Sequence, residues 1–175
     1  MRPSNKSTTG QASLFGSADA EATAPVTTRA SARAFTDGSC DTASGHGGWA
    51  YLLDAASGRS TASGYEPGTT NNRMELTAAV RALEALSEPT DVTIVTDSEY
   101  LKKAFTDGWL KKWQRNGWQT AARQPVKNRD LWEELLQLEK RHRVSWSWTR
   151  GHSGHPENEA VDALALAARR SHGRG

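Results

Sequence analysis

The 175-residue chain has a single cysteine, Cys40, and no long apolar run. One cysteine excludes an internal disulfide framework, fits a reducing compartment and argues against a cysteine-rich zinc site. Nothing approaches the roughly 18 consecutive apolar residues of a membrane span. The first residues also lack the apolar stretch of a secretory signal. We therefore expect a cytoplasmic protein without a membrane anchor, and we expect it to be a monomer.

Large apolar residues are scarce at the start of the chain. Of the first 33 residues, 19 are Ser, Thr, Ala or Gly. Such a segment buries too little surface to offset its ordering entropy, so we predict a disordered tail over 1–33. Its acidic residues, Asp19 and Glu21, argue against an organellar transit peptide.

Charge of one sign is concentrated in one part of the chain. Residues 102–129 contain eight Lys or Arg and one acid, Asp107, although the whole chain has a net charge of only +2. A basic element on an acidic body indicates a surface that binds polyanions. The alternative is an ordinary solvated helix.

Periodicity predicts an α/β layered domain over 34–170, followed by a flexible C-terminus at 171–175. Apolar alternation indicates strands and a 3.6-residue period indicates helices. The expected order is βββ-α-β-α-α-β-α, with a mixed sheet. The strands are expected near 34–37, 49–53, 59–65, 92–96 and 144–149, and the helices near 74–86, 99–105, 128–142 and 157–170.

Four carboxylates stand at or near the ends of these elements: Asp37, Glu75, Asp97 and Asp162. Each has an ordinary explanation: an Asp-Gly turn, a capping-box acid paired with Asn72, a helix cap and a surface carboxylate, respectively. Ligands of α/β sheets, however, gather at strand ends. Carboxylates that meet there need cations, and hard oxygen ligands suit Mg²⁺ or Mn²⁺.

Four segments in order and with the expected spacing resemble bacterial type 1 ribonuclease H. They are Thr36–Cys40, Thr70–Leu76, Thr96–Tyr100 and Gly151–Glu159, and the resemblance extends from about Ala34 to Ala168. It implies a five-stranded mixed sheet flanked by helices. It also implies hydrolysis of the RNA strand of RNA–DNA hybrids with two Mg²⁺ ions, for which Mn²⁺ can substitute, leaving 5′-phosphate and 3′-hydroxyl ends.

The resemblance also implies roles for individual residues. Asp37, Glu75, Asp97 and Asp162 match metal-binding catalytic carboxylates, and His152 matches a loop histidine that aids proton transfer or product release. An imidazole exchanges protons near neutral pH, which fits that role. The residues that match substrate-binding positions are Thr70, Asn71, Asn72, Arg73, Glu99, Trp109, Lys111, Lys112, Trp113, Arg115 and Trp132.

The basic segment fits such a substrate. Trp109, Trp113 and Trp118 alternate with cations, and the first two are four residues apart, on one helical face. Lysine and arginine contact phosphates without reading sequence, and exposed aromatic rings stack on bases or sugars. The alternative for Trp118 is a place in the core.

Glu99 departs from the family pattern, because relatives often have a glutamine there that contacts a 2′-hydroxyl. The connection from Lys102 to Gly108 is one residue longer than in relatives, which leaves the register of the basic segment open. Two alternative functions are a related-fold DNA nuclease or strand transferase and a non-catalytic hybrid-binding module. All four carboxylates and His152 are present, which argues against the second.

The tail contains one short motif. Gln11, Leu14 and Phe15 form a Gln-x-x-Leu-Phe pattern similar to the peptides with which bacterial replication and repair proteins bind the sliding clamp. Leu14 and Phe15 would fill an apolar pocket, and Gln11 would supply hydrogen bonds. A chance match is the alternative.

Overall fold

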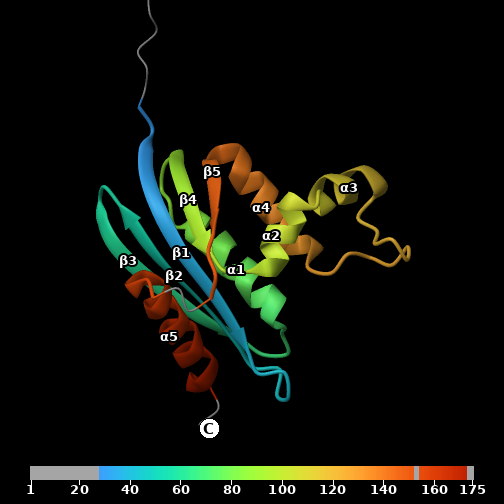
Figure 1. The fold of residues 1–175 in the computed structure, drawn as a ribbon, viewed down its shortest axis with the longest axis horizontal. Coiled ribbons are helices and arrows are strands. Elements are labelled where there is room, and N and C mark those ends of the chain that lie inside the picture. The colour runs from blue at the N-terminus through green and yellow to red at the C-terminus, as the bar shows by residue number, and fades with distance from the viewer. Residues whose placement is uncertain (1–27, 152–153, 173–175) are drawn as a thin grey trace, which may run out of the picture.

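The computed structural model describes residues 28–151 and 154–172. A five-stranded sheet in the order β3-β2-β1-β4-β5 forms its centre. β1, β2 and β3 are antiparallel neighbours, whereas β4 pairs in parallel with both β1 and β5. The expected mixed sheet flanked by helices is confirmed (Figure 1). The elements are β1 Ala30–Cys40, β2 Gly47–Ala55, β3 Gly58–Glu66, α1 Asn71–Glu84, β4 Thr90–Thr96, α2 Glu99–Thr106, α3 Trp109–Asn116, α4 Arg129–Arg141, β5 Arg143–Trp148 and α5 Pro156–Ser171.

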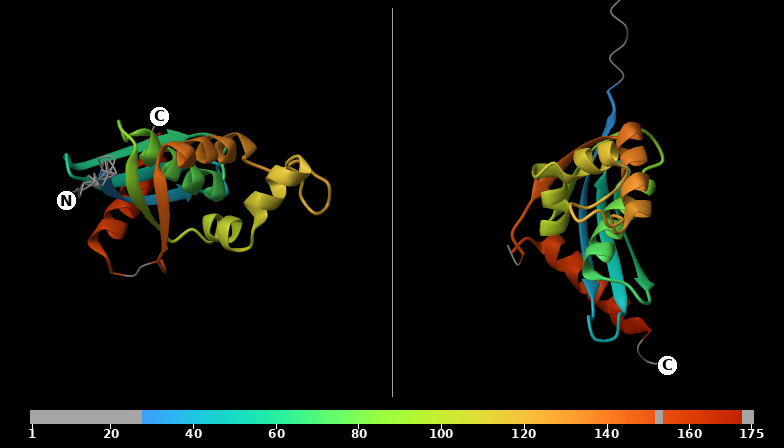
Figure 2. Two further views of the ribbon diagram at one scale, coloured as in Figure 1. Left: turned by 90° about the horizontal axis from the view of Figure 1, so that it is seen from above. Right: turned by 90° about the vertical axis from the view of Figure 1, so that its right-hand side faces the viewer.

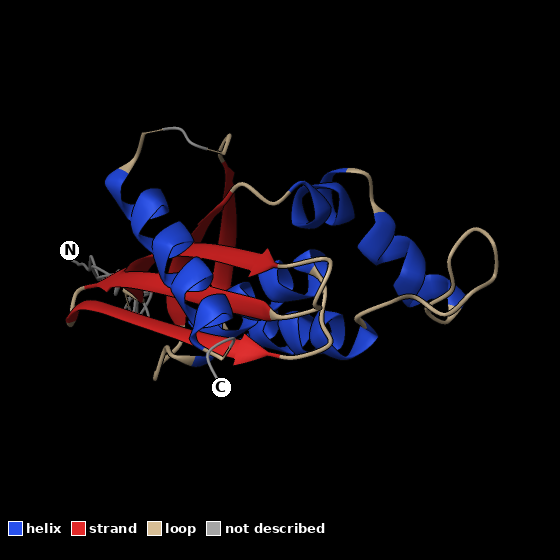
Figure 3. Ribbon diagram, turned by 90° about the horizontal axis from the view of Figure 1, so that it is seen from below, coloured by secondary structure: helices blue, strands red, loops and turns tan. Residues whose placement is uncertain are grey.

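Helices cover both faces of the sheet, and side-chain alternation along the strands supplies two apolar cores. On β1, Ala32 and Ala34 join the larger core with α1 and α4, whereas Phe35 joins the smaller core beneath α5. β4 divides in the same way, with Ile94 in the larger core and Val95 in the smaller. Figures 2 and 3 show α5 on one face and α1 and α4 on the other. The sheet is therefore buried between two helical layers.

The first strand is longer than the sequence predicted. It begins at Ala30, so residues 30–33 belong to β1 and not to the tail. It continues past Asp37, which pairs with Ala50 inside the strand, so the Asp-Gly turn explanation is wrong. Pairing with β2 on one side and β4 on the other overrides the weak strand propensity of this small-residue segment.

One helix was absent from the predicted order. α3 lies in the basic segment and buries one apolar residue, Leu110, so its apolar period is weak. It is bounded by Gly108 and Gly117, which adopt left-handed conformations with φ of 71° and 74°. These glycines were the available signal, because glycine occurs at helix N-caps, as Gly108 does, and commonly ends helices in a left-handed conformation, as Gly117 does. Figure 1 shows α3 and the loop after it projecting away from the sheet.

The helix caps differ from the sequence predictions. α1 is capped by Thr70, whose hydroxyl accepts a hydrogen bond from the backbone N–H of Arg73 at 3.2 Å. α2 is capped by Ser98 and not by Asp97. The capping explanations for Glu75 and Asp97 are therefore wrong. Both carboxylates remain available for another role.

Candidate active site

Three carboxylates from separate parts of the chain meet at one point. Asp37 lies on β1, Glu75 in the first turns of α1, and Asp97 immediately after β4. One carboxylate oxygen from each lies within 4.8 Å of the others. β1 and β4 are parallel neighbours, so the site forms beyond the C-terminal end of β4, as the rule for α/β sheets predicts.

A close backbone contact brings two of these carboxylates together. A Cβ atom placed on Gly38 would lie only 2.3 Å from the backbone nitrogen of Glu75. Glycine therefore lets β1 approach the start of α1 so closely. The Asp-Gly pair that the sequence offered as a turn serves here to place Asp37 beside Glu75.

The three carboxylates line a cleft of about 220 Å³. The fourth predicted carboxylate, Asp162, lines it from α5 and lies close enough to Asp37 to raise the pKa of that residue. The structure thus brings all four predicted carboxylates together. The cleft is also lined by residues for which the sequence predicted no individual role: Ser39, Thr149, Arg150, Asn158 and Glu159.

Two of the carboxyl groups have strongly raised pKa values. Burial, followed by the nearby Asp97 carboxylate, raises the pKa of Asp37 to about 8. Burial is also the main cause for Glu75, whose pKa rises to about 7, with Asp97 adding to the increase. Half-buried carboxylates that repel one another favour a bound cation, and their hard oxygen donors suit Mg²⁺ or Mn²⁺. The donor set therefore fits a divalent-cation site.

These pKa values predict a pH effect on the metal-free protein. Carboxyl groups with raised folded-state pKa values stabilise the fold while they are protonated. Their contribution is complete below their unfolded values of 3.8 and 4.5 and is lost as pH rises towards about 8 and 7. We expect the melting temperature in EDTA to fall between about pH 5 and pH 8, and Mg²⁺ to restore it at the higher pH.

Thermal melts of wild type and Asp37→Asn test this expectation. Other carboxyl groups titrate as well, so the difference between the two proteins isolates Asp37. The variant should show a flatter decline with pH. Parallel curves for the two proteins would contradict the assignment of a raised pKa to Asp37.

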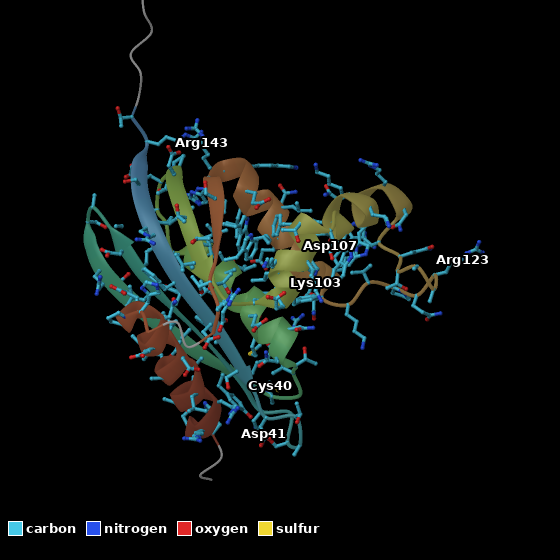
Figure 4. The ribbon with its side chains drawn as sticks, viewed as in Figure 1. Cys40, Asp41, Lys103, Asp107, Arg123 and Arg143 are labelled. Carbon is cyan, nitrogen blue, oxygen red and sulfur yellow. The ribbon has the colours of Figure 1, made fainter. Side chains whose placement is uncertain are left out.

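The predicted basic surface is present on α3. Lys111, Lys112 and Arg115 are exposed, whereas Trp109 and Trp113 are half-buried with ring centroids 6.0 Å apart. Figure 4 shows Arg123 at the far tip of the loop after α3. These cations form a projecting surface separate from the carboxylate cleft.

Two tryptophans lie in the core: Trp132 of the predicted binding set, and Trp118, whose role the sequence left open. Trp132 is completely buried, and its indole N–H donates to the Tyr100 hydroxyl at 2.9 Å, so its predicted direct contact with substrate is wrong. Trp118 is 8% exposed and takes the core role that the sequence left open. Trp113 packs against both rings. Its ring centroid lies 6.3 Å from that of Trp118 and 5.9 Å from that of Trp132. The basic helix is thus attached to the body through aromatic side chains that pack at tilted angles.

The guanidinium of Arg73, a predicted phosphate-binding residue, is hydrogen-bonded to other side chains of the protein. Its guanidinium donates to Glu66 at 2.8 Å and to both carboxylate oxygens of Asp130 at 3.0 and 2.8 Å. It also donates to the side-chain oxygen of Asn128 at 3.4 Å. These four hydrogen bonds connect β3, α1 and the start of α4. Asn128 and Asp130 are 55 and 57 residues from Arg73, so no local sequence pattern indicates this network.

Other predicted binding residues lie on exposed surface near the cleft. Thr70, Asn71 and Asn72 are exposed at the start of α1, and Glu99 is exposed at the start of α2. His152 and the tail motif lie outside the described residues. No helix among the residues that the structure describes is long and apolar enough to cross a membrane.

Comparison with known proteins gives a consistent result. The family model described as RNase H matches residues 29–170, which begins before the predicted domain start at Ala34. A ribonuclease H of Methylococcus capsulatus is 58% identical over 132 residues, covering 75% of this chain and 84% of that protein. A ribonuclease H of Thermus thermophilus is 56% identical over 131 residues, with 75% and 79% covered.

A solved structure is similar in fold. LC9-RNase H1, described as a type 1 RNase H with the type 2 active-site motif, superposes with a TM-score of 0.71 at 32% sequence identity. The alignment covers 82% of this chain and 74% of LC9-RNase H1. The family match spans the sheet, its helices and all four cleft carboxylates, so the chain belongs to the ribonuclease H family of nucleases.

Proposed function

We propose that this protein is an endoribonuclease that hydrolyses the RNA strand of RNA–DNA hybrids with two divalent cations. The products would carry 5′-phosphate and 3′-hydroxyl ends. The observation that supports this most strongly is the meeting of Asp37, Glu75 and Asp97 within 4.8 Å, in a cleft shared with Asp162. Membership of the ribonuclease H family supports it independently.

Mg²⁺ is the proposed cofactor, with Mn²⁺ able to substitute. Asp37, Glu75, Asp97 and Asp162 would hold the ions. Two such ions, when bound, would stabilise the charge on the attacking and leaving oxygens of the phosphodiester. The protein's part is to fix these carboxylates and to bring the substrate strand to them, in a cleft that also admits the water that hydrolysis consumes.

His152 is proposed to exchange a proton during turnover or to assist product release. General acid–base residues contribute typically 10²–10⁴-fold. We expect His152→Ala to slow turnover by roughly 100-fold, less than loss of a metal-binding carboxylate, and to leave hybrid affinity unchanged. Multiple-turnover rates at saturating substrate measure this, and single-turnover rates with enzyme in excess separate proton exchange from product release. A His152→Ala variant as inactive as Asp97→Asn would mean that the division of roles is wrong.

The hybrid would extend from the cleft to the basic surface on α3. Lys111, Lys112 and Arg115 are proposed to contact phosphates of the DNA strand. Asn71 and Asn72 are proposed to contact the minor groove, where 2′-hydroxyls distinguish RNA from DNA. Glu99 is proposed to accept a hydrogen bond from a 2′-hydroxyl, as a carboxylate can. The protein would act as a cytoplasmic monomer.

The N-terminal motif Gln11, Leu14 and Phe15 is proposed to bind a sliding clamp. The disorder that the sequence predicts for the tail implies moderate affinity, because ordering on binding costs free energy, but binding would raise the local concentration of the enzyme at replication forks. We expect Leu14→Ala/Phe15→Ala to abolish binding to the clamp of the same organism, with hybrid cleavage in solution unchanged. No detectable binding of the wild-type protein at high micromolar clamp concentration would refute the proposal.

A comparison of three matched substrates tests the proposed activity. Hybrid, duplex DNA and duplex RNA of one sequence are incubated with the full-length protein and Mg²⁺, and the product ends are analysed. We expect cleavage of the RNA strand of the hybrid alone. Cleavage of duplex DNA would favour a DNA nuclease or strand transferase, and binding of hybrid without any cleavage would favour a non-catalytic module.

A further inference from the structure

We propose that Ser98 and Asn71 are positioning residues that fix the Glu75 carboxylate, each on one of its two oxygens, in the orientation that binds a divalent cation. This inference rests on the cation site of the proposed function. It assigns a task to a buried serine that the predicted site did not include. It also gives Asn71 a task besides the proposed contact with substrate.

The bonding of Ser98 leaves little freedom to its hydroxyl. Ser98 is 2% exposed, and its Oγ accepts a hydrogen bond from the backbone N–H of Leu101 at 3.1 Å. A serine hydroxyl has one proton to donate. That proton is directed to Oε2 of Glu75, to which the Ser98 hydroxyl donates a hydrogen bond. The start of α2 thus holds one oxygen of a carboxylate that belongs to α1.

Asn71 holds the other oxygen from the same helix. Its side-chain amide donates to Oε1 of Glu75 at 3.3 Å, across one turn of α1. A carboxylate oxygen has two lone-pair sites, so each Glu75 oxygen keeps one for a cation. Both hydrogen bonds also favour the ionised carboxylate, which is the form that binds metal. The two donors therefore fix the plane of the Glu75 carboxylate and leave a lone pair on each of its oxygens for a cation.

The neighbouring residue offers a matched control. Asn72 is exposed like Asn71, but within 28–151 and 154–172 its side chain makes no hydrogen bond. Both asparagines are proposed to contact substrate. Only Asn71 contacts Glu75, so a measurement without nucleic acid separates the two tasks.

The test is calorimetric titration of Mg²⁺ into the full-length protein in the absence of nucleic acid. Loss of residues that orient metal ligands typically weakens metal affinity 10–100-fold. We expect Asn71→Ala and Ser98→Ala each to weaken Mg²⁺ binding by roughly 10-fold, and Asn72→Ala to bind like wild type. Cleavage by Asn71→Ala should recover in part at high Mg²⁺ concentration, which lost substrate contact alone would not produce.

Ser98→Ala also removes the cap of α2, so Ser98→Thr, which keeps the hydroxyl, is measured beside it. Restored affinity in Ser98→Thr supports the role in orientation. Asn71 is exposed, so Asn71→Ala remains decisive whatever the stability of the Ser98 variants. Wild-type affinity in Asn71→Ala would overturn the inference and leave the proposed function standing. Absence of Mg²⁺ binding by the wild-type protein would overturn the cation site itself.

Discussion

Replacing Asp37 or Asp97 by asparagine is expected to lower the rate of hybrid cleavage by roughly a thousandfold or more, because loss of electrostatic stabilisation commonly costs 10²–10³-fold or more. Both side chains belong to the group whose oxygens lie within 4.8 Å of one another. An amide keeps the shape of the carboxylate but loses the charge that holds a cation. The architecture of the cleft should therefore survive while its chemistry is lost.

Binding of the hybrid should remain in both variants. Most affinity is expected from cations on α3, and removing a negative charge from the cleft reduces its repulsion of phosphate. Turnover is measured with Mg²⁺ and affinity with Ca²⁺ in its place. Asp54→Asn, which changes an exposed carboxylate paired with Arg59, is the control and should keep full activity. Substantial Mg²⁺-dependent cleavage by Asp37→Asn or Asp97→Asn would refute the assignment of these residues.

The second large effect is expected on hybrid binding when the cations of α3 are removed. Replacing Lys111, Lys112 and Arg115 together by alanine should weaken hybrid binding irrespective of base sequence. Each phosphate contact contributes about 0.9 to the slope of log K against log salt, so the slope should fall by about two to three units. All three side chains are exposed, and the helix is attached to the core through Trp113 and Leu110. The fold should therefore tolerate the change.

The matched control removes three cations from other elements. They are Arg81 on α1, Lys140 on α4 and Arg143 on β5. Figure 4 shows Arg143 at the opposite end of the body from Cys40 and Asp41. Their replacement by alanine should leave the salt slope close to that of wild type. An unchanged slope in the α3 variant would mean that this cluster faces solvent when the hybrid is bound.

The sequence predicted the carboxylates of the site but not the contacts that support them. Asp37 and Asp97 stand in short segments with strong local patterns, and the parallel pairing of β1 with β4 brings those segments to one edge. Ser98 and Glu75 are 23 residues apart, and Arg73 and Asp130 are 57 apart. Such partners depend on how the helices pack, which periodicity does not encode.

Aromatic residues show the same limit. The four-residue spacing of Trp109 and Trp113 correctly indicated one helical face, yet the helix itself was missed because it buries a single apolar residue, Leu110. Trp132 stands in a helix whose apolar face was predicted, but its spacing could not distinguish a buried ring from a substrate contact. The structure does so, because Trp132 is fully buried and hydrogen-bonded to Tyr100.

The most direct test of the cation site is anomalous diffraction from crystals of the full-length protein soaked in Mn²⁺. Protein oxygens bind divalent ions of this size at about 2.0–2.2 Å. We predict a manganese peak at that distance from carboxylate oxygens of Asp37, Glu75 and Asp97, and its loss in Asp37→Asn. A cleft without manganese, in a protein whose hybrid cleavage requires Mn²⁺ or Mg²⁺, would contradict the assignment of these carboxylates as the metal-binding site.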